Sequence, residues 1–220
     1  MIIIPIGFQC GTATFKNEIK KSHSLPFDWM LSTPQFVFEM LVLLLEQNMD
    51  IDELVKNHFF YCDKKASIKD LGEHYYTYES GETLYGAKLY NTKYNAIFVH
   101  DNNDIESINK YIRRFKRLKD IILNSPEDLY FVHVSPSSPT VGYFTIDGND
   151  AIKDAYGYIT KIYKLIGKFR NNYKMILFDA VKKEPIELLD ENITLYKLNG
   201  GNHWSVLVSQ MSEYKHFFTK

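Results

Sequence analysis

The amino-acid sequence predicts an α/β fold in which a mostly parallel sheet lies between layers of flanking helices. Three observations predict it. The chain opens with a short β-branched run that leads into a helical pattern, and its second half alternates helical and strand patterns. Chemically notable residues also follow several predicted strands, as at the carboxyl edge of a parallel sheet. Because 220 residues is the length of one domain, we expect a single α/β domain over 1–220.

The first half of the chain is expected to hold one strand and several helices. The run from Ile2 to Ile6 is mostly β-branched and predicts a buried strand, which ends in a turn at Gly7. Ser32 or Thr33 precedes Pro34 and is a suitable N-cap for a leucine-rich helix. The helices are expected at Thr12–Lys21, Pro34–Gln47 and Asp52–Asn57. An irregular aromatic insertion follows at about 58–92 and is expected to form loops and short hairpin strands.

The second half of the chain alternates between the two periodicities. The clearest helix is expected from Asp104, its cap, to Asn124, because apolar residues recur there at helical spacing. A C-terminal helix is expected to begin at His203, just after Gly200 and Gly201. The remaining predicted elements are strands at Tyr94–Val99, Leu129–Val134, Tyr173–Phe178 and Ile193–Leu198 and a helix at Asn149–Asn171.

Composition excludes several classes of function. A formal net charge of -1 argues against a protein built to coat nucleic acid. The longest apolar stretch, Phe36–Leu45, is too short to span a membrane and contains Glu39. Two cysteines, Cys10 and Cys62, indicate a reduced, cytoplasmic chain. No histidine pair has zinc-ligand spacing and no glycine loop matches a nucleotide site, so we expect neither metal nor cofactor.

Cys10 is the leading candidate for a catalytic residue. It follows the first strand and opens a predicted helix, and a helix N-terminus favours the thiolate. Backbone N–H groups of this turn, at Gln9 and Gly11, are expected to hold a developing oxyanion. The structural alternative is that Cys10 is a small buried hydrophobic residue.

A thiolate nucleophile needs a base, and two histidines qualify. His100 follows a predicted strand, and its neighbour Asp101 is a candidate to orient the imidazole, although adjacent side chains at a strand end point apart. His203 precedes the last helix in a glycine-rich turn. The structural alternatives are a strand-ending turn for His100 and a helix cap for His203. His133 lies within an apolar strand and is expected to be a hydrogen-bonded core histidine.

Asp28 stands among apolar neighbours, so a buried carboxylate there needs a partner. It is expected either to orient an imidazole or to pair with an arginine as a structural ion pair. Three of the four arginines fall between Arg113 and Arg117 on a predicted helix. Such a run of charges usually forms a solvated helix face. In the functional alternative, Arg113 and Arg114 bind a phosphate or acidic substrate.

Several segments together resemble a known family. They are Gly7-Phe8-Gln9-Cys10, Leu25-Pro26-Phe27-Asp28-Trp29, the run into His100-Asp101, Tyr111–Phe115 and the strand Leu129–Val134. In this order they resemble the papain-like cysteine peptidase family of bacteria and large DNA viruses, over roughly the first 140 residues. The resemblance implies Cys10 as nucleophile, His100 as base and Asp28 or Asp101 as orienting acid. A papain-like fold implies a Cys-bearing helix against an antiparallel sheet.

A weaker resemblance is to SGNH-type hydrolases with cysteine in place of serine. It rests on the early Cys turn and on His203-Trp204 before the last helix, and it implies a flavodoxin-like, three-layer fold. The SGNH consensus Gly-Asp-Ser is absent, and position 200 is Gly where that family has Asp.

The sequence therefore predicts a cysteine-dependent hydrolase or acyl transferase that acts on a peptide, ester or protein substrate. One alternative is a non-catalytic protein-interaction module on the same scaffold. Another is an enzyme acting on glycans or nucleotide sugars, with Asp28 and the Arg113 cluster at a polar pocket. The oligomeric state is not predictable from these patterns.

Overall fold

The structure, a computed structural model, describes most of the predicted core elements. The described residues are 1–7, 10–19, 23–61, 64–66, 88–91, 93–94, 96–98, 101, 104–134, 145–146, 149–150, 155–179, 192–198 and 204–218.

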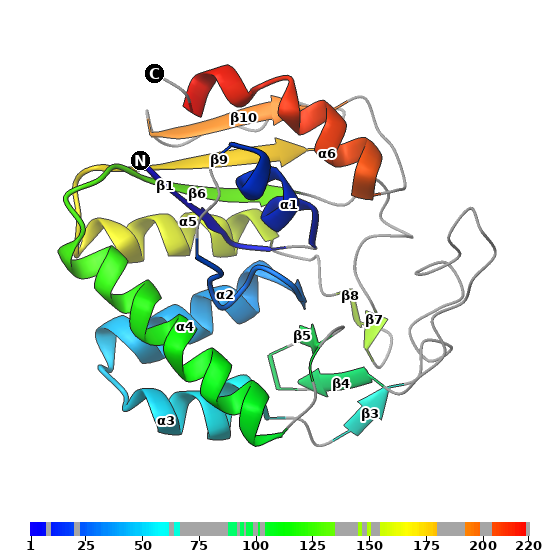
Figure 1. The fold of residues 1–220 in the computed structure, drawn as a ribbon, viewed down its shortest axis with the longest axis vertical. Coiled ribbons are helices and arrows are strands. Elements are labelled where there is room, and N and C mark those ends of the chain that lie inside the picture. Colours follow the sequence, from blue (N-terminus) through cyan, green and yellow to red (C-terminus); the bar gives the residue numbers. More distant parts are fainter. Residues whose placement is uncertain are drawn as a thin grey trace.

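A parallel sheet of four strands forms the centre of the molecule (Figure 1). Its strands are β1 (Ile2–Pro5), β6 (Leu129–Val134), β9 (Tyr173–Asp179) and β10 (Ile193–Lys197), in that order across the sheet. All three pairings are parallel. The α/β prediction is therefore confirmed, and each of these strands lies within one residue of its predicted bounds.

Helices cover both faces of this sheet because alternate side chains point to opposite sides. Helices α1 (Cys10–Ile19) and α6 (Trp204–Ser212) cover one face. The apolar residues between these helices and the sheet include Ile3, Phe15, Val132, Val134, Ile176, Phe178 and Met211.

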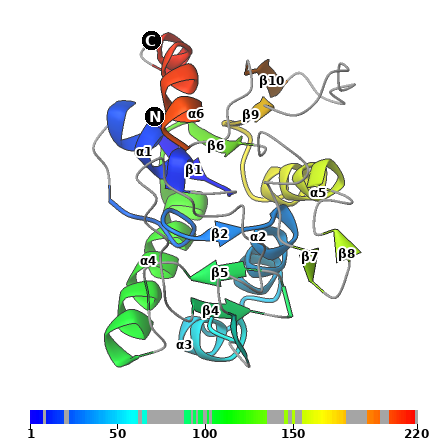
Figure 2. The same ribbon diagram turned by 90° about the vertical axis from the view of Figure 1, so that its right-hand side faces the viewer.

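The other face of the sheet packs on α2 (Pro34–Leu41), α4 (Ile105–Asn124) and α5 (Ala155–Gly167). Figure 2 shows this arrangement from the side, with α1 and α6 on one side and α5 on the other. The apolar residues that fill this larger core include Ile4, Leu41, Leu118, Ile122, Phe131, Ile162, Met175 and Leu177.

A second, antiparallel sheet lies beside the first, with strand order β2-β5-β4-β3. Its strands are β2 (Leu31–Ser32), β5 (Ala96–Phe98), β4 (Lys88–Asn91) and β3 (Lys64–Ala66). The strand predicted at Tyr94–Val99 is β5, so its assignment to the parallel sheet was wrong. Strand periodicity reports burial and carries no information on which sheet a strand joins. Strands β3 and β4 come from the predicted insertion and pair as the short hairpin strands expected there, although most of the insertion lies outside the described residues.

The helices that follow β2 in the chain begin at the predicted cap. The Thr33 hydroxyl accepts a hydrogen bond from the backbone N–H of Phe36 at 3.1 Å, and Pro34 opens α2. The predicted helix to Gln47 continues as a π-helix at Val42–Glu46. A second helical stretch follows, as α3 (Ile51–Glu53) and a π-helix at Leu54–Phe59.

Two predicted helices are shorter than expected. The helix predicted at Asn149–Asn171 is α5 (Ala155–Gly167), and its first residues form β8 (Asn149–Asp150), which pairs with β7 (Thr145–Ile146). The Asp-Gly dipeptide between these strands is a strong hairpin signal that the sequence analysis missed. The predicted C-terminal helix is α6, followed by a 3-10 helix at Lys215–Phe218.

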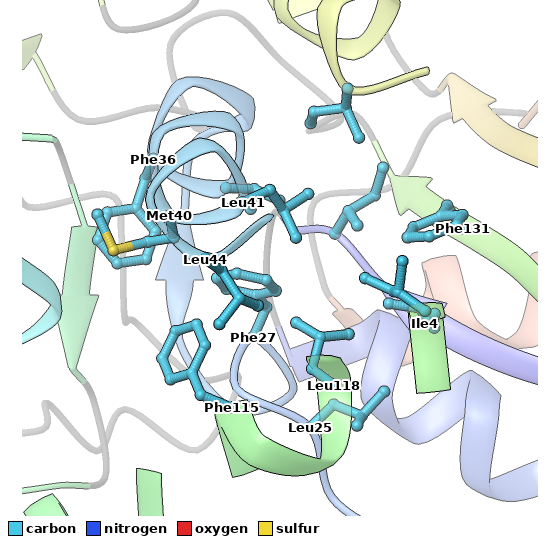
Figure 3. Packing of buried hydrophobic residues seen from close by; sticks show 14 of the residues in the cluster. Ile4, Leu25, Phe27, Phe36, Met40, Leu41, Leu44, Phe115, Leu118 and Phe131 are labelled. Carbon is cyan, nitrogen blue, oxygen red and sulfur yellow. The ribbon is translucent and has the colours of Figure 1, made fainter. Parts of the chain in front are cut away.

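An irregular segment, residues 23–30, runs along the β1 edge of the parallel sheet and is part of the core. Phe27 packs edge-on against Phe36 and Phe115, with ring centroids 6.2 and 6.0 Å apart. Figure 3 shows Leu25 and Phe27 beside Leu118 and Phe115 of α4. This packing fixes the position of Asp28, whose carboxylate belongs to the candidate site.

None of the helices in the described part of the chain combines the length and the apolar character that a membrane span requires.

Candidate functional site at the carboxyl edge of the parallel sheet

Cys10 is the first residue of α1, just beyond the carboxyl end of β1. The chain leaves β1 through Gly7, whose φ of +99° favours glycine. A Cβ on Gly7 would lie 2.8 Å from the backbone oxygen of Ser32, so a side chain does not fit there. The described part of Cys10 is its backbone. The N–H groups of the first turn of α1 lack partners within the helix, and such groups bind anions.

Helix α6 packs against α1 on the same face of the sheet. The two helices are parallel, since each follows a strand of the parallel sheet and runs back across it (Figure 1). Near their C-terminal ends, the Ser212 hydroxyl donates a hydrogen bond to the Glu18 carboxylate. Each of these residues comes eight positions after the first residue of its helix, Cys10 or Trp204. The N-termini of α1 and α6 are therefore neighbours at the carboxyl edge.

Asp28 forms a buried ion pair with Lys16 of α1, and each side chain is only 1% exposed. Oδ2 of Asp28 accepts both from Lys16 Nζ and, at 2.9 Å, from the backbone N–H of Leu25. Burial raises the pKa of the Asp28 carboxyl, whereas Lys16, the Leu25 N–H and Arg114 act in the opposite direction. The partner of Asp28 is thus a lysine of α1, where the sequence analysis expected an arginine or an imidazole.

Lys16 was missed as a site residue. The sequence analysis did not consider Lys16, which shares a buried face of α1 with Thr12 and Ala13. The available signal was the odd carboxylate at Asp28, because a buried carboxylate requires a cation within reach. Nothing in the sequence distinguished Lys16 from the neighbouring Lys20 and Lys21.

Asp101 is held by α4. Its carboxylate accepts a hydrogen bond from the Tyr111 hydroxyl at 2.7 Å and pairs with Lys110. Burial and the Asp101 charge raise the pKa of Tyr111, so this phenol stays protonated as the donor. The guanidinium of Arg114 lies over the Tyr111 ring, with Cζ 5.0 Å from the ring centroid. In the described contacts, Asp101 therefore binds the first turns of α4.

The arginines of α4 differ in their environment. Arg113 is exposed, as the solvated-face interpretation expects. Arg114 is half-buried and its charge acts on Asp28, while Arg117 donates to the backbone oxygen of Ser24 at 2.6 Å. Two of the three arginines thus turn towards the 23–30 segment. The expectation that all three form a solvated face was wrong, because that segment covers this side of the helix.

His133 is a core residue, as predicted, but one of its nitrogens lacks a partner. Nδ1 lies 3.4 Å from the backbone oxygen of Ile6, and the buried Nε2 has no hydrogen-bond partner in the part of the chain that the structure describes. Burial lowers the pKa of His133 to about 4, so the imidazole is neutral near pH 7. Because a carbonyl only accepts, Nδ1 carries the proton.

Three predicted site residues, Gln9, His100 and His203, lie outside the described residues. His203 directly precedes the first residue of α6 in the sequence, and His100 directly precedes Asp101. Gly11 is buried within the first turn of α1. Among the side chains that the structure describes, no three His, Cys, Asp or Glu residues gather as a metal site would require.

A comparison with known families matches residues 1–139 to the family described as "Putative papain-like cysteine peptidase (DUF1796)". The chain belongs to this family. The matched region runs from β1 to just past β6 and contains Cys10, Asp28 and His100. His203 and α6 lie outside it. No curated protein and no solved structure matches the chain.

The arrangement of this family member differs from the layout that the family name implies. A papain-like fold would set the Cys-bearing helix against an antiparallel sheet, whereas α1 packs on the parallel sheet. The antiparallel sheet is present, but it lies beside the parallel one and pairs β2 with β5. Strand β1, the turn at Gly7 and α1 therefore follow the order of a parallel α/β enzyme, with its site at the carboxyl edge.

Proposed function

We propose that the protein is a cysteine-dependent hydrolase or acyl transferase with Cys10 as its nucleophile. The observation that carries the proposal is the position of Cys10, which opens α1 at the carboxyl edge of a parallel sheet. Membership in a family named for cysteine peptidases supports it independently. The positive end of the α1 dipole favours a thiolate at this position. The chemistry requires a reducing compartment, because an oxidised thiol is no nucleophile.

In the proposed reaction, the Cys10 thiolate attacks the carbonyl carbon of a peptide, isopeptide or ester. The carbonyl oxygen becomes an oxyanion. Backbone N–H groups of the first turn of α1, a turn that contains Gly11, stabilise this oxyanion. The bond to the leaving amine or alcohol breaks, and an imidazolium donates its proton to that group. Water, activated by the same imidazole, then hydrolyses the thioester and releases the acid.

We propose His203 as the imidazole base. The packing of α6 beside α1 supports it, because His203 directly precedes α6 in the sequence. His100 is the alternative, and the family match supports it, because the matched region includes His100 and ends before α6. The next residue after His100, Asp101, is bound to Tyr111 and Lys110 of α4.

The proposal is tested by measuring the rate of Cys10 alkylation by iodoacetamide between pH 5 and 10. The protein carries Cys62→Ala, which leaves a single thiol, and the Cys10→Ala/Cys62→Ala variant supplies the blank. We expect alkylation to follow a thiolate that titrates well below the free value of about 8.5. A thiol that reacts only after the protein unfolds would refute the proposal and favour the non-catalytic interaction module.

Acyl transfer itself is tested with p-nitrophenyl esters. The same single-thiol protein is expected to release a burst of nitrophenol equal to the amount of Cys10, and mass spectrometry of the quenched protein should show the acyl group on that residue. Absence of both signals from a protein with a reactive thiol would show that Cys10 is not an acyl acceptor.

A further inference from the structure

We propose that the buried Lys16–Asp28 ion pair is a positioning device that holds α1, and with it the Cys10 thiol, at the carboxyl edge of the sheet. This inference rests on the proposed function. Lys16 and Asp28 are positioning residues in it, since both act on the reacting atoms through α1.

The pair joins two elements that otherwise lie on different sides of the β1 edge. Lys16 belongs to α1, which packs on one face of the parallel sheet, and Asp28 belongs to the 23–30 segment, whose Leu25 and Phe27 pack in the core on the other face. Lys16 Nζ also donates to the backbone oxygen of His23 at 3.3 Å. One ammonium group thus makes two contacts with the same segment.

The segment is in turn held by α4. Arg117 donates to the backbone oxygen of Ser24, and the charge of Arg114 acts on Asp28. Phe27 packs against Phe115 of the same helix. A continuous series of contacts therefore runs from α4 through the segment and Lys16 to α1.

The ion pair adds a polar connection to the apolar packing that already holds α1 against the parallel sheet and α6. β1 is an edge strand within the described sheet, and it is joined to α1 by four residues, which are Ile6, Gly7 and two that lie outside the described part. Lys16 comes six positions after Cys10, so the pair fixes the helix less than two turns from the thiol. An error of about 1 Å in the position of a reacting group can cost about a hundredfold in rate.

The pair also differs from a plain stabilising contact. Buried ion pairs contribute little net stability compared with apolar or neutral replacements, but loss of one partner leaves an uncompensated charge. Oδ1 of Asp28 and Nη1 of Arg114 are both buried, and neither atom has a hydrogen-bond partner among the described residues. Oδ1 is therefore the one oxygen of Asp28 left to orient an imidazole, which is the competing role that the test must separate.

The test compares three variants in the Cys62→Ala background: Lys16→Met, Asp28→Asn and the double variant. The readout is the pH profile of Cys10 alkylation. In each single variant, Cys10 is expected to be alkylated at least about tenfold more slowly at pH 7, and its titration is expected to move to higher pH. The double variant removes both charges and keeps an acceptor for the Leu25 N–H. Its alkylation rate at pH 7 is expected to return to within a few-fold of the rate of the Cys62→Ala parent.

Arg170→Met is the matched control for loss of stability. Arg170 is also a buried cation, but it lies just before β9, at the amino ends of the parallel strands and away from Cys10. It donates to backbone oxygens that follow the end of α4. This variant is expected to unfold at lower temperature and to keep the parent alkylation profile. If it changes the profile as much as Lys16→Met does, general destabilisation explains the effect and the inference fails.

Three outcomes separate the inference from the proposed function. If the parent thiol shows no enhanced reactivity, the proposed function fails, and the inference with it. If the parent is reactive and Lys16→Met matches it, the inference alone is wrong. If the double variant remains as slow as Asp28→Asn while staying folded, Asp28 acts directly on an imidazole and the positioning role is overturned.

Discussion

The buried imidazole of His133 makes a defined contribution to the pH dependence of stability. Its pKa is about 4 in the folded protein and about 6.5 when the chain is unfolded. Between these values the unfolded chain binds a proton that the folded protein excludes, so stability falls as the pH drops from 6.5 towards 4. The loss at the lower end is about 3 kcal/mol.

Urea unfolding of the parent and of His133→Gln at several pH values from 4 to 7 checks this prediction. The variant is expected to lose less stability than the parent across that window, since glutamine does not titrate. Equal slopes for the two proteins would show that His133 is not the group responsible. All other titrating groups are common to both proteins and cancel in the comparison.

At the scale of single residues, the sequence supplied the candidates but not their partners. Cys10 and Asp28 stood out because each is chemically unusual among its neighbours. The Lys16–Asp28 pair joins residues twelve positions apart through the path of an irregular segment, and periodicity does not report such paths. The unpartnered Nε2 of His133 was likewise unpredictable, because it depends on what packs around a buried strand.

Arg170 supports the end of α4, and its loss is expected to destabilise the protein by about 3 kcal/mol. Its guanidinium donates to four backbone oxygens, those of Ile121, Ile122, Ser125 and Glu127. These include carbonyls that the last turn of a helix leaves without partners. Urea unfolding of Arg170→Met measures the loss.

Arg170→Lys is the conservative comparison for this prediction. It is expected to recover only part of the free energy of unfolding that Arg170→Met loses. The single ammonium group cannot reach all the carbonyls that the two ends of the planar guanidinium contact. Full recovery by lysine would show that the charge alone matters and that the array of hydrogen bonds does not.

At the scale of elements, long periodic segments were predicted well and pairings were not. The α4 helix begins after its predicted cap, where the Asp104 carboxylate accepts from the Ser107 N–H at 2.8 Å. Strand β5 was placed in the wrong sheet, and β8 was predicted as the start of a helix. Both errors concern short strands, whose partners are set by tertiary contacts more than by their own pattern.

The matched family region is expected not to fold without the rest of the chain. Residues 1–139 end just after β6, which pairs with β9 along its whole length. Both faces of β6 are buried, by Phe131 on one side and Val132 on the other, and α5, β9 and α6 contribute to both cores. A truncated chain would expose this surface to water.

Thermal unfolding followed by circular dichroism distinguishes the two outcomes. The full chain should unfold in one cooperative transition, and the 1–139 fragment should show none. A cooperative transition in the fragment would mean that the family region is a domain in itself, contrary to the expectation of a single domain over 1–220.

At the scale of the whole molecule, the parallel sheet followed from the order of its elements. Helices alternating with buried strands leave few arrangements other than parallel strands with helical crossovers, and four such strands are present. Short hairpin strands were expected in the aromatic insertion, and β3 and β4 pair in this way. Their joining with β5 and β2 in a second sheet was not foreseen, because the partners of short strands are set by tertiary contacts.

The most direct test of the account is the identity of the base that serves Cys10. We would measure the thiolate titration of Cys10 by alkylation in His203→Ala and in His100→Ala, each with Cys62→Ala. Our account predicts a shift of the profile towards higher pH in His203→Ala and an unchanged profile in His100→Ala, because α6 begins beside α1. A shift in His100→Ala alone would contradict it and would assign the base to the matched family region.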